Sequence, residues 1–550
     1  MKRNLLKKLP RTMLTGVAAL GMLLPAASAA TARPAMPGPV HGGTVRVVFT
    51  GDFVSFDPAQ SANDDWLVVQ GTLYNGLYAI DAHGQPALDL AAKAPTISTD
   101  RKVWTFQLRH GVRFSNGAEL TADDVQFSLT RVLDSHLKPA ASWGQPSDDI
   151  FQGSHDFVTG KTKSVSGIKA LDRYTVRFIL TQPIAIFPYL LGESFNRIVP
   201  KATVMAVGDL AFGNHPVGSG PFMLKSWSKG SSAVFVRNPF YFRKGKPYLD
   251  SVIAYSNVSP SVAALKVERG EADGFGFAPE LTAADRNQAK GDAKYASWLR
   301  PAPITQVVWL NLNVHADPLT NAQIRQAAAM AINRPRLAHL LGGTAIPAYQ
   351  LYMPAYPQHD PAINQHPVYA YDPARARTLL KASAYHGQPI TLYYASDLQR
   401  NLALAPGVQQ DLQQVGFTIN LRTTTDASMS AVRAKLTGHQ IDINGDTLGY
   451  PDATDLYLIQ MNCASNVDGG GSGAHYCDPL ADTLVTQAEG LPLGAARNAL
   501  LRKAQTRILL SASQIPLVFM KPAAFVSPTV QGFYYHPIFG WDYENYWVRH

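Results

Sequence analysis

Short β-strand patterns alternate along this chain with amphipathic helix patterns, and this alternation is the feature that most restricts the fold. In each strand pattern, β-branched, aromatic and other apolar side chains dominate or alternate with polar ones. These strands are predicted at residues 44–49, 104–109, 174–178 and 307–313. Because strands that alternate with amphipathic helices pack as layers of sheet and helix, we expect a mixed α/β protein.

Two of the predicted helices begin with a capping-box pattern. Thr121 stands three residues before Asp124, and Thr320 stands three residues before Gln323. Apolar residues follow each cap at helical spacing. In the second helix this buried stripe is predicted to contain Ile324, Ala328, Ile332 and Leu337.

The first thirty residues have the order of a secretory signal peptide. Basic residues precede an apolar run at 12–24, and the small residues at 27–29 predict cleavage after Ala29. The run is too short for a membrane span, and no later segment has the roughly 20 apolar residues that a transmembrane helix needs. No cysteine follows the cleavage site, so we expect export to the periplasm without a lipid anchor.

The charge and the length exclude some classes of protein. The chain of 550 residues carries a net charge of +9, and five of these charges lie in the leader, which leaves +4 for the rest. Lys and Arg form no basic run elsewhere, so we expect no nucleic-acid partner. A chain of this length favours two or three domains over a single core.

The sequence contains two cysteines, Cys463 and Cys477. In an oxidising compartment we expect them to form a disulfide bond, and glycines between them allow the loop to close. Closing such a loop stabilises the protein by roughly 3 kcal/mol in the chain-entropy model. The alternative is a pair of buried thiols, whereas a metal site would need more nearby ligands than His475.

Recognisable catalytic motifs are missing from the sequence. It has neither the Gly-x-Ser-x-Gly elbow of hydrolases nor the His-Glu-x-x-His helix of zinc proteases. The segment 160–162 resembles the end of a phosphate-binding loop, but His155 replaces the first glycine. We therefore expect no enzymatic activity, no cofactor and no metal site.

An ordered set of segments resembles the peptide-binding family of extracellular solute-binding proteins, family 5. This family contains the dipeptide and oligopeptide receptors of ABC importers. The segments are 104–117 (WTFQLRHGVRFSNG), 120–129, 216–222 (PVGSGPF), 237–241, 270–273, 324–334, 371–373 and 476–479.

The resemblance implies the two-lobed periplasmic-binding-protein fold, an α/β fold with a hinge and an extra subdomain in the first lobe. Ligand would bind in the cleft between the lobes, which close around it. An extended peptide would be held through its backbone. The implied divisions are a signal peptide at 1–29, lobe I at 30–79 and 210–303, its subdomain at 80–209, lobe II at 304–514, and a return to lobe I at 515–550.

The resemblance also suggests a ligand site at residues 445–452 (GDTLGYPD), which align with the family pattern Gly-Trp-x-x-Asp-Tyr-x-Asp. The first Asp of that pattern pairs with the terminal ammonium of the peptide, and here the position is Gly449. Because a buried ammonium needs a partner, we hypothesise that Asp446 replaces the missing acid, with Asp452 as second candidate. The alternative is that Asp446 is an exposed loop acid and that Asp452 caps the following helix.

We expect ligand contacts from this segment and from the strand at 307–313, while other aromatic residues either line the cleft or belong to the core. The predicted ligand-binding residues are Gly445, Asp446, Thr447, Gly449, Tyr450, Asp452, Trp309 and Asn311. The further aromatic candidates are Trp227, Tyr457 and Trp541.

The function expected is that of a monomeric periplasmic receptor that captures a short peptide and presents it to the permease of an ABC importer. The second hypothesis is a receptor for a non-peptide ligand, such as a metal chelate, haem, a glutathione-like or a sugar-containing compound, or a signalling or chaperone role, because a fold does not define its cargo. A secreted hydrolase is the third. Tight reversible binding without turnover would exclude the hydrolase.

Overall fold

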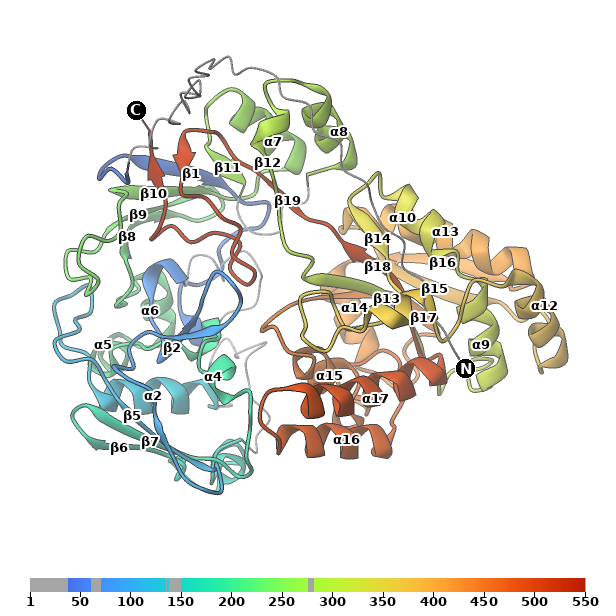
Figure 1. Cartoon of the computed structure of the whole chain (residues 1–550), viewed down its shortest axis with the longest axis horizontal. Helices are drawn as coiled ribbons and strands as arrows, with labels where there is room; N and C mark the ends of the chain where they lie inside the picture. Colours follow the sequence, from blue (N-terminus) through green and yellow to red (C-terminus); the bar gives the residue numbers. More distant parts are fainter. Residues whose placement is uncertain (1–37, 61–70, 135, 138–149, 276–280, 550) are drawn as a thin grey trace, which may run out of the picture. The chain divides into compact units, whose positions relative to one another are not determined.

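The computed structural model describes residues 38–60, 71–134, 136–137, 150–275 and 281–549 (Figure 1). The signal peptide predicted at 1–29 lies outside these residues. From Pro39 onward the chain belongs to one compact unit. Within the described ranges, no helix combines the length and the apolar character that a membrane crossing requires.

A five-stranded sheet contains the first strand predicted from the sequence. Its order is β11-β1-β10-β9-β8, in which β1 runs parallel to both neighbours and the other pairs are antiparallel. A dense aromatic cluster that includes Phe49, Phe56 and Trp541 packs against it. The strands are β1 (Thr44–Val48), β8 (Phe222–Ser228), β9 (Ser232–Arg237), β10 (Ser251–Tyr255) and β11 (Gly274–Phe275).

A four-stranded antiparallel sheet of order β4-β5-β7-β6 contains the next two predicted strands. One face is apolar, since Trp104, Phe106, Val176 and Phe178 are buried. The strands are β4 (Thr96–Ile97), β5 (Val103–Gln107), β6 (Ile168–Asp172) and β7 (Thr175–Ile179). A short hairpin of β2 (Tyr78–Ile80) and β3 (Pro86–Leu88) precedes this sheet in sequence.

A six-stranded mixed sheet has the order β14-β18-β13-β17-β15-β16. The central strand β13 runs antiparallel to β17 and β18, and β15 runs parallel to β16 and β17. In Figure 1 the helices α9, α10, α12 and α13 gather around this sheet. The strands are β13 (Gln306–Leu312), β14 (Ala345–Pro347), β15 (Ile390–Ala395), β16 (Ile419–Thr424), β17 (Ile441–Thr447) and β18 (Gln514–Met520).

Two chain passages connect the five-stranded and six-stranded sheets, and they pair with each other. The chain enters β13 from β12 (Leu299–Pro301) and leaves β18 through β19 (Ala523–Phe525). A final pair, β20 (Val530–Gln531) with β21 (Trp547–Val548), follows. Residue 515, where the return to lobe I is predicted to begin, lies in β18, which pairs with β13 and β14.

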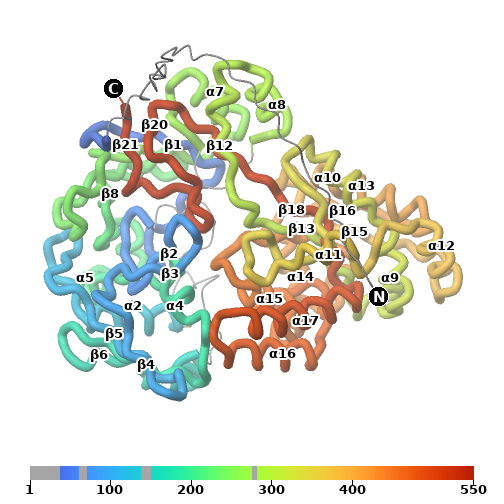
Figure 2. The backbone as a smooth tube through the Cα atoms, viewed as in Figure 1, coloured from blue at the N-terminus to red at the C-terminus, as the bar shows by residue number. Residues whose placement is uncertain are grey.

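The helices are mostly short, and α16 and α17 lie side by side (Figure 2). In the first half they are α2 (Ala122–Val132), α3 (Ser154–Val158), α4 (Phe187–Leu190), α5 (Lys201–Val207), α6 (Asp209–Asn214), α7 (Pro260–Glu268) and α8 (Ala283–Gly291). In the second half they are α9 (Ala322–Ala331), α10 (Arg334–Leu340), α11 (Pro361–Gln365), α12 (Pro373–Ala382), α13 (Gln399–Val415), α14 (Asp426–Arg433), α15 (Thr454–Gln460), α16 (Pro479–Glu489) and α17 (Ala495–Ser511).

The first capping prediction is confirmed and the second is wrong. The Thr121 N–H and hydroxyl both donate to Oδ2 of Asp124 at the start of α2. At α9 the cap is Asn321, whose Oδ1 accepts the N–H of Gln323. Thr320 instead donates its hydroxyl to Asp317, because the chain still turns before the helix starts.

The second predicted helix is two helices. All four residues of its predicted stripe are buried, but α9 ends at Ala331 and α10 starts at Arg334. Pro335 has no N–H to continue the α9 hydrogen bonds, and the Asn333 side chain caps the new helix. The predicted disulfide between Cys463 and Cys477 is present.

Candidate functional site

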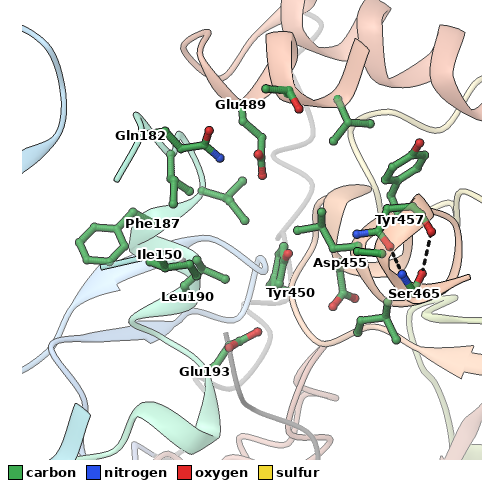
Figure 3. A pocket seen from close by; sticks show the side chains of 18 of the residues that line it. Ile150, Gln182, Phe187, Leu190, Glu193, Tyr450, Asp455, Tyr457, Ser465 and Glu489 are labelled. Carbon is green, nitrogen blue, oxygen red and sulfur yellow. Dashed lines mark hydrogen bonds between the residues drawn. The ribbon is translucent and has the colours of Figure 1, made fainter. Parts of the chain in front are cut away.

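A cavity of about 700 Å³ lies where two distant parts of the sequence meet. One wall comes from residues 129–196 and the other from residues 450–489 (Figure 3). Much of the lining is apolar, and it includes Ile150, Phe187, Leu190, Leu458 and Val485. A volume of this size is in the range of small-molecule and short-peptide sites.

The charged part of the described lining is acidic. Among the described residues that line the cavity, Glu193, Asp455, Asp482 and Glu489 carry carboxyl groups, and none is Lys, Arg or His. Three of the four have a raised pKa. Such a lining favours a ligand with positive charge and repels an anion.

Asp455 lies in the first turn of α15, and its side chain is buried. Its Oδ2 accepts the N–H of Gly449 at 2.8 Å and the hydroxyl of Tyr356 at 3.1 Å. Burial raises the pKa of Asp455 to about 8, and the nearby charge of Glu193 also raises it. In the empty cavity this carboxyl is therefore close to its titration point at neutral pH.

Gly449 explains how Asp455 reaches this position. A Cβ atom at Gly449 would stand 2.8 Å from Oδ1 of Asp455, which is closer than normal contact. The Asp455 carboxyl therefore occupies the space that a side chain at residue 449 would take. An acid from six residues further along the chain thus lies directly beside Gly449.

Glu193 faces Asp455 from the other wall of the cavity. Its side chain points towards Tyr450 and Asp455 in Figure 3. No other described residue donates a hydrogen bond to its carboxylate, and burial raises its pKa to about 8. Two carboxyl groups that influence each other's charge in a buried space prefer to share a proton or a cation.

Glu489 is the last residue of α16 and is 8% exposed. In Figure 3 its carboxyl group points from the helix into the cavity. No described residue donates a hydrogen bond to it. Burial raises its pKa to about 7, and the attraction of Arg497 only partly opposes this shift.

Tyr450 and Asp482 also line the cavity. The Tyr450 ring is buried and lies 6.3 Å from the ring of Tyr189. Asp482, unlike Glu193 and Glu489, accepts hydrogen bonds from described residues, namely the Tyr457 hydroxyl at 2.8 Å and the Cys463 N–H at 3.0 Å. Tyr457, a further aromatic candidate from the sequence, also lines the cavity.

The Asp452 carboxylate is paired with other residues of the protein. Its carboxylate accepts both terminal nitrogens of the buried Arg497 guanidinium, at 2.5 and 2.8 Å. It also accepts the side-chain amide of Gln358 and the N–H of Thr454 at the start of α15. The N-cap of α15 is Ala453 rather than Asp452, and Asp452 does not line the cavity.

Trp309 and Asn311 lie inside the six-stranded sheet and are fully buried. The Trp309 indole N–H donates to Oδ1 of Asn311, and the Asn311 amide donates to Asp442. Asp442 also accepts the Arg433 guanidinium, so these residues belong to a buried polar network. They lie behind the cavity and do not line it.

Gly445, Asp446 and Thr447 form the end of β17 and are partly buried. Oδ1 of Asp446 accepts the N–H of Thr447 at 2.8 Å, and Asp446 is therefore not the exposed loop acid of the alternative interpretation. None of the three residues lines the cavity. Of the residues predicted from the sequence to bind ligand, the structure places Tyr450 directly on the cavity wall.

None of the four acids among the described residues of the cavity wall was predicted from the sequence. Asp455 could have been found, since it is an acid close to the position where the family pattern expects one. Glu193 and Glu489 have no local signal, because only the folded chain brings them to the cavity. Across the described part of the chain, no group of three or more His, Cys, Asp or Glu is placed to hold a metal ion.

The fold and the cavity define a mixed α/β binding protein. The chain belongs to the bacterial extracellular solute-binding proteins, family 5, whose model matches residues 85–467. It is 27% identical over 514 residues to the glutathione-binding protein GsiB of Shigella dysenteriae, with 91% of this chain and 94% of the relative covered. It is 28% identical over 470 residues to di/tripeptide-binding protein 2 of Pseudomonas aeruginosa, with 82% and 84% covered.

Solved structures agree on the fold. The ABC transporter-associated periplasmic binding protein DppA from Helicobacter pylori, in complex with the peptide STSA, superposes with a TM-score of 0.78 at 23% identity. The match covers 92% of this chain and 98% of that protein. The expectation of the two-lobed periplasmic-binding-protein fold is confirmed.

Proposed function

We propose that this chain is the substrate-binding protein of an ABC importer and that it holds short peptides in the cavity between Glu193 and Asp455. The observation that carries the proposal is the acidic lining of an apolar cavity. A peptide offers one terminal ammonium for the carboxyl groups and apolar side chains for the walls. A buried cation requires such partners, because an unpaired charge is costly in a medium of low polarity.

Asp455 is our first choice for the partner of the ammonium. Its carboxyl lies directly against Gly449, where a Cβ atom would stand 2.8 Å from Oδ1, and the residue lines the cavity. Glu193 adds negative charge from the opposite wall. The earlier candidate Asp446 remains a rival, and it predicts that Asp446→Asn weakens peptide binding.

Export and transport complete the proposal. A leader at 1–29 would send the chain to the periplasm, where it would remain without a lipid anchor. Closure would occur about the β12–β19 pair that joins the two sheet regions, with lobe II ending after Met520. The closed monomer would deliver its unaltered ligand to the permease, with no catalysis and no nucleic-acid partner.

Native mass spectrometry of the protein purified from the periplasm tests this function. We expect a peptide mass to be bound, and calorimetric titration of the ligand-free protein with alanine di- and tripeptides to show reversible binding. Glutathione is the informative comparison, because it carries two carboxylates and the lining repels anions. A bound non-peptide mass, or a chemical change in the peptide after incubation, would refute the proposal.

Two substitutions separate the candidate ammonium partners. Asp455→Asn should weaken the binding of the tripeptide, whereas Asp446→Asn should leave it unchanged. The reverse result would return the role to Asp446. Glu271→Gln, which removes an exposed acid paired with Lys266 at 3.3 Å, is the matched control.

A further inference from the structure

Glu489 is a buried acid of the cavity. If the terminal ammonium of a peptide pairs with Asp455, Glu489 is still left without a cationic partner. The charge of Glu193 acts on Asp455, whereas the charged groups that act on Glu489 are Arg497 and Asp452, and Figure 3 shows Glu489 on a part of the wall away from Glu193 and Asp455. The cavity therefore has two separate acidic points. A ligand with a single ammonium satisfies one of them and leaves the other buried without a partner.

The protein itself does not satisfy Glu489. Arg497 is the nearby cation, but both of its terminal nitrogens are engaged by Asp452. Asp482, on the same helix, shows the contrast, since it accepts two hydrogen bonds from Tyr457 and Cys463. Glu489 is more than nine-tenths buried as a residue, and a carboxylate on the cavity wall without a donor among the described residues calls for an explanation.

The surroundings of Glu489 indicate what its partner would be. The lining contains aliphatic and aromatic side chains, among them Ile184, Val485 and Leu458, and no described basic residue. Apolar walls that end at a single carboxylate suit an unbranched aliphatic stem with a terminal ammonium. A divalent metal ion would need further ligands, and the described residues offer no group of three.

We propose that Glu489 is a second cation-binding point of this cavity, so that preferred ligands carry a lysine-type side chain in addition to their terminal ammonium. The inference rests on the proposed function, because it takes this cavity as the ligand site. It adds a substrate class, namely short basic peptides. The cavity provides the volume for the lysine-type side chain, and Glu489 provides the preference for its positive charge.

Matched peptides test the inference on the whole mature protein. The test set is Lys-Ala-Ala, Ala-Lys-Ala and Ala-Ala-Lys, each compared with the peptide in which norleucine replaces lysine. Norleucine keeps the aliphatic stem and removes the charge. At pH 8, we expect at least one lysine peptide to bind roughly 10- to 100-fold more tightly than its norleucine partner, the range of a charged hydrogen bond.

Substitution of Glu489 tests whether this residue causes the preference for lysine peptides over norleucine peptides. Glu489→Gln keeps the shape of the neutral acid, and we expect it to reduce the lysine-to-norleucine ratio to below about threefold. Glu271→Gln should keep the full ratio. If Glu489→Gln does not fold, the comparison of the two peptides on the unaltered protein still decides the question.

The outcomes separate this inference from the function on which it rests. Equal binding of lysine and norleucine peptides overturns the second cation-binding point and leaves peptide binding intact. A preference for lysine that persists in Glu489→Gln also overturns it. If none of the peptides binds, both the inference and the proposed function are wrong.

Discussion

Asp455→Asn should change stability and ligand binding in opposite directions. Asparagine has the shape of the protonated acid and can accept the same hydrogen bonds from Gly449 and Tyr356. It cannot become negatively charged. The substitution therefore removes the energetic penalty of a buried charge and, at the same time, the partner of a ligand cation.

The size of the stability effect follows from the pKa of Asp455. The pKa rises from 3.8 to about 8 on folding, because of burial first and the Glu193 charge second. A pKa raised by folding means that the folded protein favours the protonated acid, so its stabilising contribution is complete below pH 4 and is lost as the pH rises to 8. At about 1.36 kcal/mol for each pKa unit, the loss approaches about 6 kcal/mol as an upper limit.

Chemical denaturation of the ligand-free protein at pH 5 and pH 8 measures this effect. The groups that face Asp455 are Glu193, Tyr356 and Tyr450, and of these only Glu193 titrates in the same range. We expect Asp455→Asn to be more stable than the unaltered protein by only about 1.6 kcal/mol at pH 5, which lies 1.2 units above the unfolded pKa of 3.8. At pH 8 the variant should be more stable by several kcal/mol, since it carries no buried charge.

Calorimetric titration with a lysine-containing tripeptide measures the binding effect. The unaltered protein should bind more tightly as the pH rises from 6 to 8, because the cavity acids become charged and pair with the ligand. Asp455→Asn should bind roughly 10- to 100-fold more weakly at pH 8. A variant that is less stable than the unaltered protein at pH 8, or that binds equally well, would refute this account of Asp455.

Two further predictions concern the framework around the cavity. Asp452→Asn leaves the buried Arg497 without its anion, so the free energy of unfolding should fall by roughly 3–5 kcal/mol in chemical denaturation. Unchanged stability together with lost peptide affinity would instead restore Asp452 as an ammonium partner. Cys463→Ser combined with Cys477→Ser removes the disulfide and should lower the free energy of unfolding by about 3 kcal/mol, because the unfolded chain regains the freedom of the loop. Equal stability of the oxidised unaltered protein and the double variant would contradict this.

Local patterns predicted local structure well. The strands β5, β7 and β13 follow from alternation, and the capping box at Thr121 follows from spacing, because neighbouring residues decide both features. The misplaced cap at Thr320 shows the limit of this reasoning. Asn321 was an equally good cap by residue type, and the turn before it decided between them.

The candidate site was only partly predictable. The resemblance directed attention to residues 445–452, and Tyr450 from that segment does line the cavity. Asp452, in contrast, is held by Arg497, which lies in a different helix and is not visible as a partner in the sequence. A carboxylate is a ligand group or a structural ion-pair member according to which cation lies near it, and spacing along the chain does not show this.

The sequence by itself determined the class of fold, the disulfide and the family, since these depend on residue patterns and on motifs that remain in order along the chain. Only the tertiary structure decided which acids meet in the cavity. Glu193, Asp455 and Glu489 come from three separate segments, and folding withdraws them from water together. Burial raises the pKa values of these three acids, and their charged forms are stabilised by a bound cation. Burial depends on the packing of the whole chain, so no single segment shows it.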